Sequence, residues 1–398
     1  MTFPRSAYLH IPFCRRRCFY CDFPVAVVGD KVPLGTGDRI NGSNSKTIAH
    51  YVEVLCQEIQ QTPKSGQPLA TVFFGGGTPS LLSVEQLAQI LTVLEQQFGL
   101  EESAELSMEI DPATFDLAQL AGYKAAGINR VSLGVQAFQG HLLQAAGRSH
   151  TVADIEAAIA VVQAVGVTNL SLDLISGLPH QTLADWVESL ERAIALGPTH
   201  LSCYDLIVEA GTPFSRQYQP GCQPLPSDEL TAEMYRTAHH LLTAHGFEHY
   251  EISNYAKPGY HCRHNRTYWE NRPFYGFGMG ATSFVNGDRV ARPRKTHDYY
   301  AWVAGLAHSP AASAIAPPPD LLETLMLGLR LAEGVDLEAL TQTFGADAIA
   351  TVLTSLQPFI ERQWVSPPTT TDRRLCLTAP DGFLFSNTIL TALFQALD

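Results

Sequence analysis

Strand-like and helical stretches alternate along the first half of the chain. Ser83 precedes one helical stretch and is expected to cap it. Six strands in β-α-β order predict a parallel sheet. Because no dinucleotide-binding fingerprint accompanies them, we expect an α/β fold with a partial (β/α)6 barrel rather than an open, doubly wound sheet. The short apolar runs expected to form strands are residues 6–11, 70–74, 105–110, 130–133, 170–175 and 200–206. Helical spacing of apolar side chains separates them at residues 48–61, 83–98, 116–126, 152–165 and 183–196.

The alternation stops after residue 225. A helix is expected over residues 228–245 and an edge strand over 249–255, followed by an aromatic, glycine-rich stretch. A Pro- and Ala-rich stretch at 308–320 suits a linker. Three helical patterns, two short strands and a last helix then predict a winged-helix-like module. The expected division is a barrel in residues 1–225, a bridging segment in 226–310 and a C-terminal α+β region ending in the winged-helix-like module in 311–398.

Composition and charge exclude several function classes. The chain has 398 residues and a formal net charge of −13, which argues against nucleic-acid binding because phosphates require a basic face. No apolar stretch is long enough to cross a bilayer. Residues 1–8 contain neither a long apolar region nor a small-residue cleavage site, so no signal peptide is expected. We therefore expect a cytoplasmic protein without an integral membrane segment.

Three of the eight cysteines lie close together. Cys14, Cys18 and Cys21 follow the first predicted strand with the spacing C-x3-C-x2-C. Thiolates ligate iron–sulfur clusters, and a [4Fe–4S] cubane has four irons. Three nearby thiolates therefore leave one iron open to an outside chelate, such as the amino and carboxylate groups of S-adenosylmethionine (SAM).

A zinc knuckle is the alternative interpretation of this loop. Zinc requires four ligands, and the nearest extra candidate, His10, lies on the preceding strand. Tyr20, directly before the last cysteine, suits an adenine contact and has no use in a zinc knuckle. The loop therefore favours a cluster over zinc.

Glycine or polar residues lie at the ends of the following predicted strands. The glycine turn at residues 75–79 could present backbone amides to the amino-carboxylate end of a ligand. Each polar residue alone is more commonly a satisfied side chain than a ligand contact. Because barrel strands end on one face, the set together favours a binding site there. Its members are Gly76, Gly77, Thr78, Glu109, Gln136 and Asp173, with Arg148 one helical segment after Gln136.

Several motifs together resemble one family. They are Tyr8-Leu-His-Ile-Pro-Phe-Cys14, the cysteine spacing, the glycine turn, Gly134-Val-Gln-Ala-Phe138 and Ser176-Gly-Leu-Pro179. Over nearly the whole chain they resemble the radical SAM proteins related to oxygen-independent coproporphyrinogen III oxidase. The resemblance implies a [4Fe–4S] cluster on Cys14, Cys18 and Cys21, with SAM as the second cofactor. It also implies that the SAM contacts are Tyr8, Tyr20, Gly76, Gly77, Thr78, Glu109, Gln136, Arg148 and Asp173.

Two features separate the branches of this family. The oxidases carry a further cysteine two residues after the third ligand, where this chain has Phe23. The sequence His264-Asn-Arg-Thr-Tyr-Trp269 is similar to the signature of the paralogous heme chaperones. That resemblance implies heme as cargo and hemoproteins as acceptors, with respiratory-chain components as candidates.

The residues of this second motif suit a heme. Neutral imidazole, here His264, is a good axial ligand for heme iron, and His261 or Cys262 could compete with it. The alternative is that His264 caps a loop and that the aromatic residues belong to the core. Asn265 completes the polar part of the motif, and flat apolar surface comes from Tyr268, Trp269, Phe274, Tyr275 and Phe277.

The shared cofactors leave other functions open: oxidative decarboxylation of coproporphyrinogen, or another radical SAM reaction. Phe23 and the 264–269 motif favour the chaperone. Arg15, Arg16 and Arg17 place three positive charges on the cysteine loop. They indicate either a solvated loop or a docking site for an acidic electron donor such as a ferredoxin or flavodoxin. Residues 29–45 resemble an inserted surface loop and receive no role.

Overall fold

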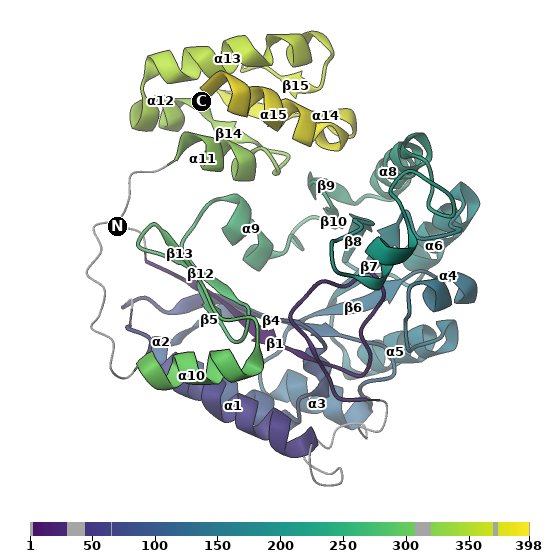
Figure 1. Cartoon of the computed structure of the whole chain (residues 1–398), viewed down its shortest axis with the longest axis vertical. Coiled ribbons are helices and arrows are strands. Elements are labelled where there is room, and N and C mark those ends of the chain that lie inside the picture. The colour runs from purple at the N-terminus through teal and green to yellow at the C-terminus, as the bar shows by residue number, and fades with distance from the viewer. Residues whose placement is uncertain (1–2, 30–43, 65, 307–319, 369–372, 398) are drawn as a thin grey trace.

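A nine-stranded sheet forms the centre of the protein (Figure 1). The structure is a computed structural model and describes residues 3–29, 44–64, 66–306, 320–368 and 373–397. Its strand order is β11-β1-β4-β5-β6-β7-β8-β10-β9. The inserted loop expected at 29–45 and the linker expected at 308–320 fall almost entirely outside the described residues. Within the described ranges, no helix is long and apolar enough to cross a membrane.

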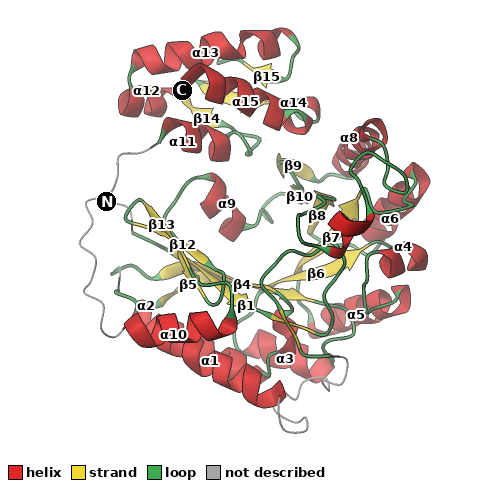
Figure 2. Cartoon of the chain, in the orientation of Figure 1, coloured by secondary structure: helices red, strands yellow, loops and turns green. Residues whose placement is uncertain are grey.

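The six predicted strands form a parallel series within this sheet, as expected of a partial barrel. They are β1 (Ser6–Ile11), β4 (Leu69–Gly76), β5 (Leu100–Ile110), β6 (Arg130–Gln136), β7 (Asn169–Ser176) and β8 (His200–Asp205). Helices follow between them and cover the outer face (Figure 2). These are α1 (Asn44–Gln61), α2 (Val84–Phe98), α3 (Leu117–Ala125), α5 (Val152–Val165) and α6 (Leu183–Ala195), with the short α4 (Gly140–Ala145) before α5.

Capping boxes fix the first turns of three of these helices. In α2 the Ser83 side chain accepts a hydrogen bond from Gln86 N, and the Gln86 side chain accepts one from Ser83 N. Thr151 and Thr182 begin α5 and α6 in the same way. Each box satisfies two backbone N–H groups that lack a partner within the helix. The predicted cap at Ser83 is confirmed.

The bridging segment extends the sheet at both edges. β11 (Tyr275–Phe277) lies parallel to β1, whereas β10 (Asn254–Ala256) lies antiparallel to β8 and to β9 (Glu248–Glu251). The edge strand expected over 249–255 is therefore a pair of antiparallel strands. The predicted boundaries at 225 and 310 stay predictions. The segment also contains α8 (Asp228–Ala244), α9 (Arg263–Trp269), β12 (Thr282–Val285), β13 (Asp288–Ala291) and α10 (Thr296–Leu306).

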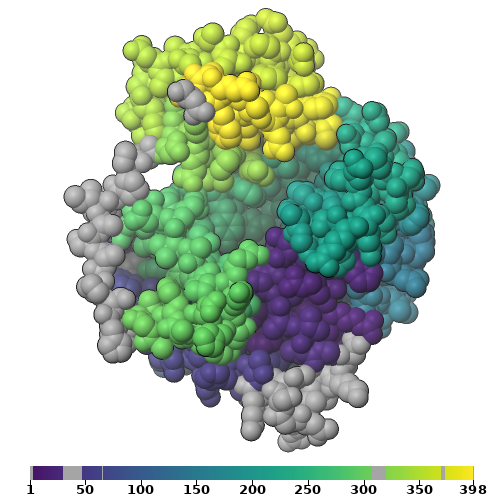
Figure 3. All heavy atoms as spheres, in the orientation of Figure 1, coloured from purple at the N-terminus to yellow at the C-terminus, as the bar shows by residue number. Residues whose placement is uncertain are grey.

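The C-terminal module has its own hydrophobic core. Its order of helix, strand, helix, helix, strand and strand, with three antiparallel strands, is that of a winged helix. The winged-helix-like module was predicted with two strands, and the third, between the first two helices, was not expected. Figure 3 shows the module, in yellow-green and yellow, against the teal segment that contains α8. Its elements are α11 (Leu321–Gly328), β14 (Val335–Asp336), α12 (Leu337–Phe344), α13 (Ala346–Glu361), β15 (Val365–Ser366), β16 (Arg374–Leu377), α14 (Asp381–Leu384) and α15 (Ser386–Leu397).

A buried ion pair joins α1 to the bridging segment. Glu58 is fully buried, and its carboxylate accepts hydrogen bonds from Arg292 Nε at 2.8 Å and the Tyr299 hydroxyl at 2.7 Å. The Gly278 backbone N–H donates to the same carboxylate at 2.8 Å. Because each partner comes from the bridging segment, this one carboxylate holds that segment against the barrel.

Replacing Arg292 with Met should destabilise the protein by about 3–5 kcal/mol, since it leaves the buried Glu58 carboxylate without its cation. The matched control is Arg272→Met, because Arg272 pairs with Glu270 at the surface. The control substitution should lower the free energy of unfolding by less than about 1 kcal/mol, because it removes only a surface ion pair. Urea denaturation of both variants measures the difference, and equal losses of unfolding free energy would contradict the importance of the buried pair.

Candidate functional site

A cavity of about 360 Å³ lies at the carboxyl ends of the barrel strands. The cysteine loop forms one wall, and the ends of β4 to β8 form the rest. Parallel strands end on the same side of a barrel, so residues far apart in sequence meet here. The cavity is lined by Cys14, Cys18 and Cys21, and by the predicted contacts Tyr20, Gly76, Gly77, Thr78, Glu109, Gln136, Arg148 and Asp173.

The thiols are held by hydrogen bonds from the barrel. Cys14 ends β2 (Phe13–Cys14), which pairs with β3 (Ala26–Val27), and its Sγ accepts a hydrogen bond from Thr78 Oγ1 at 3.7 Å. Cys18 Sγ accepts one from Arg148 Nη1 at 3.2 Å. Burial raises the pKa of Cys14 to about 12, although the bond from Thr78 opposes the rise. A thiolate at this position therefore requires a nearby cation, which the irons of a cluster supply.

The arrangement of the cysteines fits a cluster better than a single metal ion. Across the part of the chain that the structure describes, no three His, Cys, Asp or Glu side chains are placed to hold one metal ion. A zinc site requires four such ligands around one atom. In a cubane each cysteine ligates its own iron, so the three thiols need only face a common space. Cys14, Cys18 and Cys21 do so.

The glycine turn after β4 packs directly against the cysteine loop. Gly77 N donates to Ile11 O at 2.9 Å, and Thr78 N donates to Phe13 O at 2.7 Å. A Cβ on Gly77 would lie 2.7 Å from Phe13 O, closer than real contacts allow. Gly76 adopts φ 108°, which side-chain-bearing residues rarely adopt. The close approach of the two backbones therefore requires glycine at position 77, and the backbone conformation requires it at position 76.

Two half-buried carboxylates face the cavity. Glu109 Oε2 accepts a hydrogen bond from Gly76 N at 3.0 Å, and Asp173 Oδ1 accepts one from Ser132 Oγ at 2.9 Å. Burial, and after it the charge of Asp173, raise the pKa of Glu109 to about 7. Burial also raises the pKa of Asp173. Together the two groups form a site for positively charged parts of a ligand, such as an ammonium.

Gln136 reaches the cavity through an irregularity in β6. Its φ is 68°, and the pairing with β7 shifts register between Gly134 and Gln136. Positive φ is uncommon for a residue with a side chain. The pattern of strand residues alone therefore gives no indication of where this side chain points.

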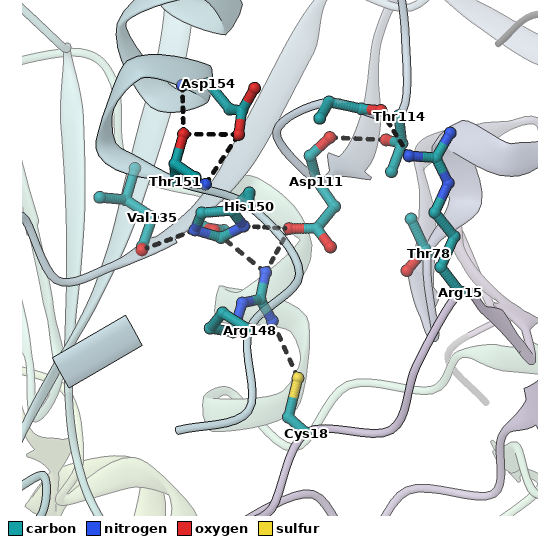
Figure 4. A network of polar contacts seen from close by, with 12 residues as sticks. Arg15, Cys18, Thr78, Asp111, Thr114, Val135, Arg148, His150, Thr151 and Asp154 are labelled. Atoms are coloured by element: carbon teal, nitrogen blue, oxygen red, sulfur yellow. Dashed lines mark hydrogen bonds and ion pairs between the residues drawn. The ribbon is translucent and has the colours of Figure 1, made fainter. Parts of the chain in front are cut away.

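Arg148 links the cysteine loop to the barrel (Figure 4). Its Nη2 pairs with Asp111 and donates to Gly134 O at 3.2 Å, while Nη1 donates to Cys18 Sγ. His150 Nδ1 lies 3.3 Å from the same Asp111 oxygen. Burial raises the pKa of Asp111, but Arg148 and His150 outweigh this effect and hold it below its usual value. The charged Asp111 thus orients the guanidinium.

Asp111 and His150 are site residues that the sequence reasoning missed. Asp111 carries a weak signal, because it directly follows the third predicted strand, two residues after Glu109. His150 carries no local signal, since its importance comes from a contact with another strand.

Tyr8 is half-buried inside the barrel, beside the cavity-lining Glu109 and not itself among the lining residues. Its hydroxyl hydrogen-bonds His10 Nδ1 at 3.1 Å, and its ring stacks on Phe73 with centroids 6.3 Å apart. Phe73 in turn stacks on His264, and the centroids of these two rings lie 5.2 Å apart. On the other side Tyr8 lies near Glu109, since a Cβ on Gly75 would be 3.0 Å from Tyr8 Cε2 and 3.1 Å from Glu109 Oε1. Its role as a SAM contact stays a prediction.

The predicted heme ligand, His264, is 1% exposed and lies in the amino-terminal half of the barrel. Its Nδ1 bonds Thr71 Oγ1 and its Nε2 bonds the Tyr268 hydroxyl, both at 2.8 Å. Burial lowers its pKa to about 3. Because both ring nitrogens have partners, iron ligation by His264 requires one of these hydrogen bonds to break. Its role as a ligand stays a prediction.

The remaining members of the motif are also held by the fold. The Arg330 guanidinium of the C-terminal module lies 5.1 Å from the centre of the Trp269 ring, and Asn265 is half-buried on α9. Cys262 Sγ bonds Glu105 Oε1 at 3.7 Å, and His261 Nε2 lies 2.7 Å from Glu248. The motif therefore packs α9 against the barrel and the C-terminal module.

Comparison with known proteins agrees with this fold and site. The radical SAM superfamily model matches residues 8–193, and the HemN C-terminal domain model matches residues 316–384. The solved coproporphyrinogen III oxidase HemN from Escherichia coli has a TM-score of 0.80 and 23% identity, and covers 98% of this chain and 90% of its own. At that identity the likeness establishes the fold alone. Fold and site together define a radical SAM protein.

Similar proteins of known name show which family of radical SAM proteins the chain resembles. The heme chaperone HemW of Synechocystis sp. is 48% identical over 99% of this chain and 97% of its own length. HemW of Bacillus subtilis is 36% identical over 86% of this chain and 87% of its own length. Escherichia coli HemW is also 36% identical, over 74% of both chains. The chain belongs to the HemW family.

Replacing Asp111 with Asn should weaken SAM binding about tenfold, because Arg148 loses a charge-assisted partner worth roughly 1.5–3 kcal/mol. The control is Asp288→Asn, on the exposed strand β13. Anaerobic calorimetric titration of the cluster-containing protein with SAM measures both affinities. An unchanged affinity in the Asp111 variant would show that the guanidinium is held in place without this carboxylate.

SAM binding should weaken as the pH falls through about 7, the raised pKa of Glu109. Above that pH the carboxylate is charged and attracts the positive groups of SAM, whereas below it the carboxyl is neutral. Glu109→Gln should bind weakly at every pH and lose this dependence. Repeating the calorimetric titration at several pH values between about 6 and about 8 measures this pH dependence. An identical pH profile in wild type and in the Glu109→Gln variant would exclude Glu109 as the titrating group.

Proposed function

We propose that this protein is a heme chaperone that binds heme and transfers it to acceptor hemoproteins, dependent on a [4Fe–4S] cluster and SAM. The observation that carries the proposal is the full-length identity to the Synechocystis heme chaperone. The cavity supports it with the thiols, glycine turn and carboxylates that these cofactors require.

Within this proposal each part of the cavity has a task. Cys14, Cys18 and Cys21 would hold the cluster, and what the cluster supplies when bound is single-electron chemistry at the sulfonium of SAM. The amides of the glycine turn bind the amino-carboxylate end of SAM, and Tyr20 contacts the adenine. Arg148 donates to the Cys18 sulfur and fixes its position at the cavity wall. The remaining proposed contacts, from the barrel strands, are Tyr8, Glu109, Gln136 and Asp173.

Oxidative decarboxylation of coproporphyrinogen is the alternative function. The oxidases resembled by the chain carry a cysteine at the position of Phe23. Phe23 is 54% exposed beside the cavity, so the loop presents an apolar ring there in place of a thiol. This substitution and the identity to HemW proteins favour the chaperone.

We also propose a cytoplasmic location and an acidic electron donor, a ferredoxin or flavodoxin, that docks on the arginines of the cysteine loop. Arg16 and Arg17 are exposed, whereas Arg15 Nη1 donates to Ala113 O at 2.7 Å and holds the loop to the barrel. The rest of the protein is acidic, with a net charge of −13 for the whole chain, so this loop is where negative charge would be attracted. Respiratory-chain hemoproteins are candidate acceptors.

Anaerobically reconstituted protein should bind about one heme per chain and should not decarboxylate coproporphyrinogen. Absorption titration with ferric heme and a decarboxylation assay on the same sample measure the two properties. Turnover of coproporphyrinogen without heme binding would identify an oxidase. A His264→Ala variant, with the exposed His141→Ala as control, tests the predicted iron ligand, because only loss confined to the first variant would assign the ligand to His264.

A further inference from the structure

Three exposed apolar side chains lie at the mouth of the cofactor cavity. Among the described residues that line it, Phe23 is 54% exposed, Tyr204 43% and Ile207 67%. Phe23 belongs to the cysteine loop, whereas Tyr204 and Ile207 lie on β8 and in the segment after it. Large apolar side chains exposed singly are ordinary, but their gathering at one cavity indicates a binding surface.

Tyr204 shows that this surface is built into the barrel. Its ring is partly exposed, while its hydroxyl forms a hydrogen bond with the side chain of Ser202, a buried residue of the same strand. This bond holds the hydroxyl against the barrel and leaves part of the ring facing solvent. A tyrosine anchored in this way presents a fixed, flat face to a ligand.

We propose that Phe23, Tyr204 and Ile207 form a rim at the mouth of the cavity that holds the heme. One face of the macrocycle lies on these three side chains. The inference rests on the proposed function, because it takes heme as the cargo. The cavity of about 360 Å³ lies between the cluster cysteines and the proposed SAM contacts, so a macrocycle lies across its mouth rather than within it. His264 is buried with both ring nitrogens engaged, so the rim is the accessible site in this structure.

Charge sets the direction in which the heme lies. Arg16 and Arg17 line the mouth on the side of the cysteine loop, and Asp205 lines it on the side of β8. The two propionates of heme are anionic, so they point toward the arginines and away from Asp205. A docked electron donor and a bound heme would compete for these arginines.

The rim also suits release of the heme. Of the described residues that line the cavity, none is a histidine or a methionine, the neutral side chains that ligate heme iron most often. Binding through the apolar face and the propionates leaves the iron open to a ligand from an acceptor protein. The acceptor can then compete for the heme without first breaking a strong bond to the chaperone.

Replacing Ile207 with Glu tests the rim, because it adds a negative charge and removes an apolar contact at an exposed position. The control is Val290→Glu, since Val290 is 46% exposed on β13 and does not line the cavity. Titration of cluster-containing, full-length protein with ferric heme should give a dissociation constant at least tenfold higher for the Ile207 variant and within twofold of wild type for the control. Unchanged binding by the Ile207 variant would overturn the proposal.

A second variant tests the propionate side. Arg16→Gln combined with Arg17→Gln should weaken heme binding and flatten its dependence on salt concentration. An unchanged salt dependence would contradict the proposed orientation. If wild-type protein binds no heme, the proposed function itself fails. If wild type binds heme and only His264→Ala loses it, the function stands and the rim is wrong.

Discussion

Six consecutive strands run parallel and therefore end on the same side of one barrel. This constraint assembles the site, because it brings a loop that begins at Cys14 beside Glu109, Arg148 and Asp173 in one cavity. Burying polar groups costs free energy unless they are hydrogen-bonded or paired. The carboxylates and the guanidinium in this cavity each have such a partner from a neighbouring strand or turn. The site thus depends on strand order more than on any single residue.

The two ends of the barrel have different roles. At the carboxyl end, charged and thiol groups face a cavity. Toward the amino end, the rings of Tyr8, Phe73 and His264 stack in sequence, and the His264 side chain is closed by hydrogen bonds to Thr71 and Tyr268. The motif that resembles a heme-binding signature therefore packs against the barrel interior. For this reason we propose the cavity mouth as the heme-binding site.

Sequence patterns predicted the features that depend on neighbouring residues. The alternation of strands and helices, the cysteine spacing and the glycine turn at 75–79 are local, and the structure arranges them as expected. Asp111 and His150 were missed because Asp111, the common partner of Arg148 and His150, comes from a separate segment and meets them only through packing. Tyr8 stays a predicted contact, because alternation along a strand does not say how deep in a barrel a side chain lies. The short edge strands β10 and β11 contain only three residues each, too few to show a period.

The central claim is that Cys14, Cys18 and Cys21 hold a cluster with one iron open to SAM. The most direct measurement is electron paramagnetic resonance of the anaerobically reconstituted, reduced protein before and after SAM is added, with iron and sulfide analysis of the same sample. The account predicts about four irons per chain and a cluster spectrum that changes when SAM binds. A protein that takes up zinc instead of iron, or a cluster whose spectrum SAM leaves unchanged, would contradict it.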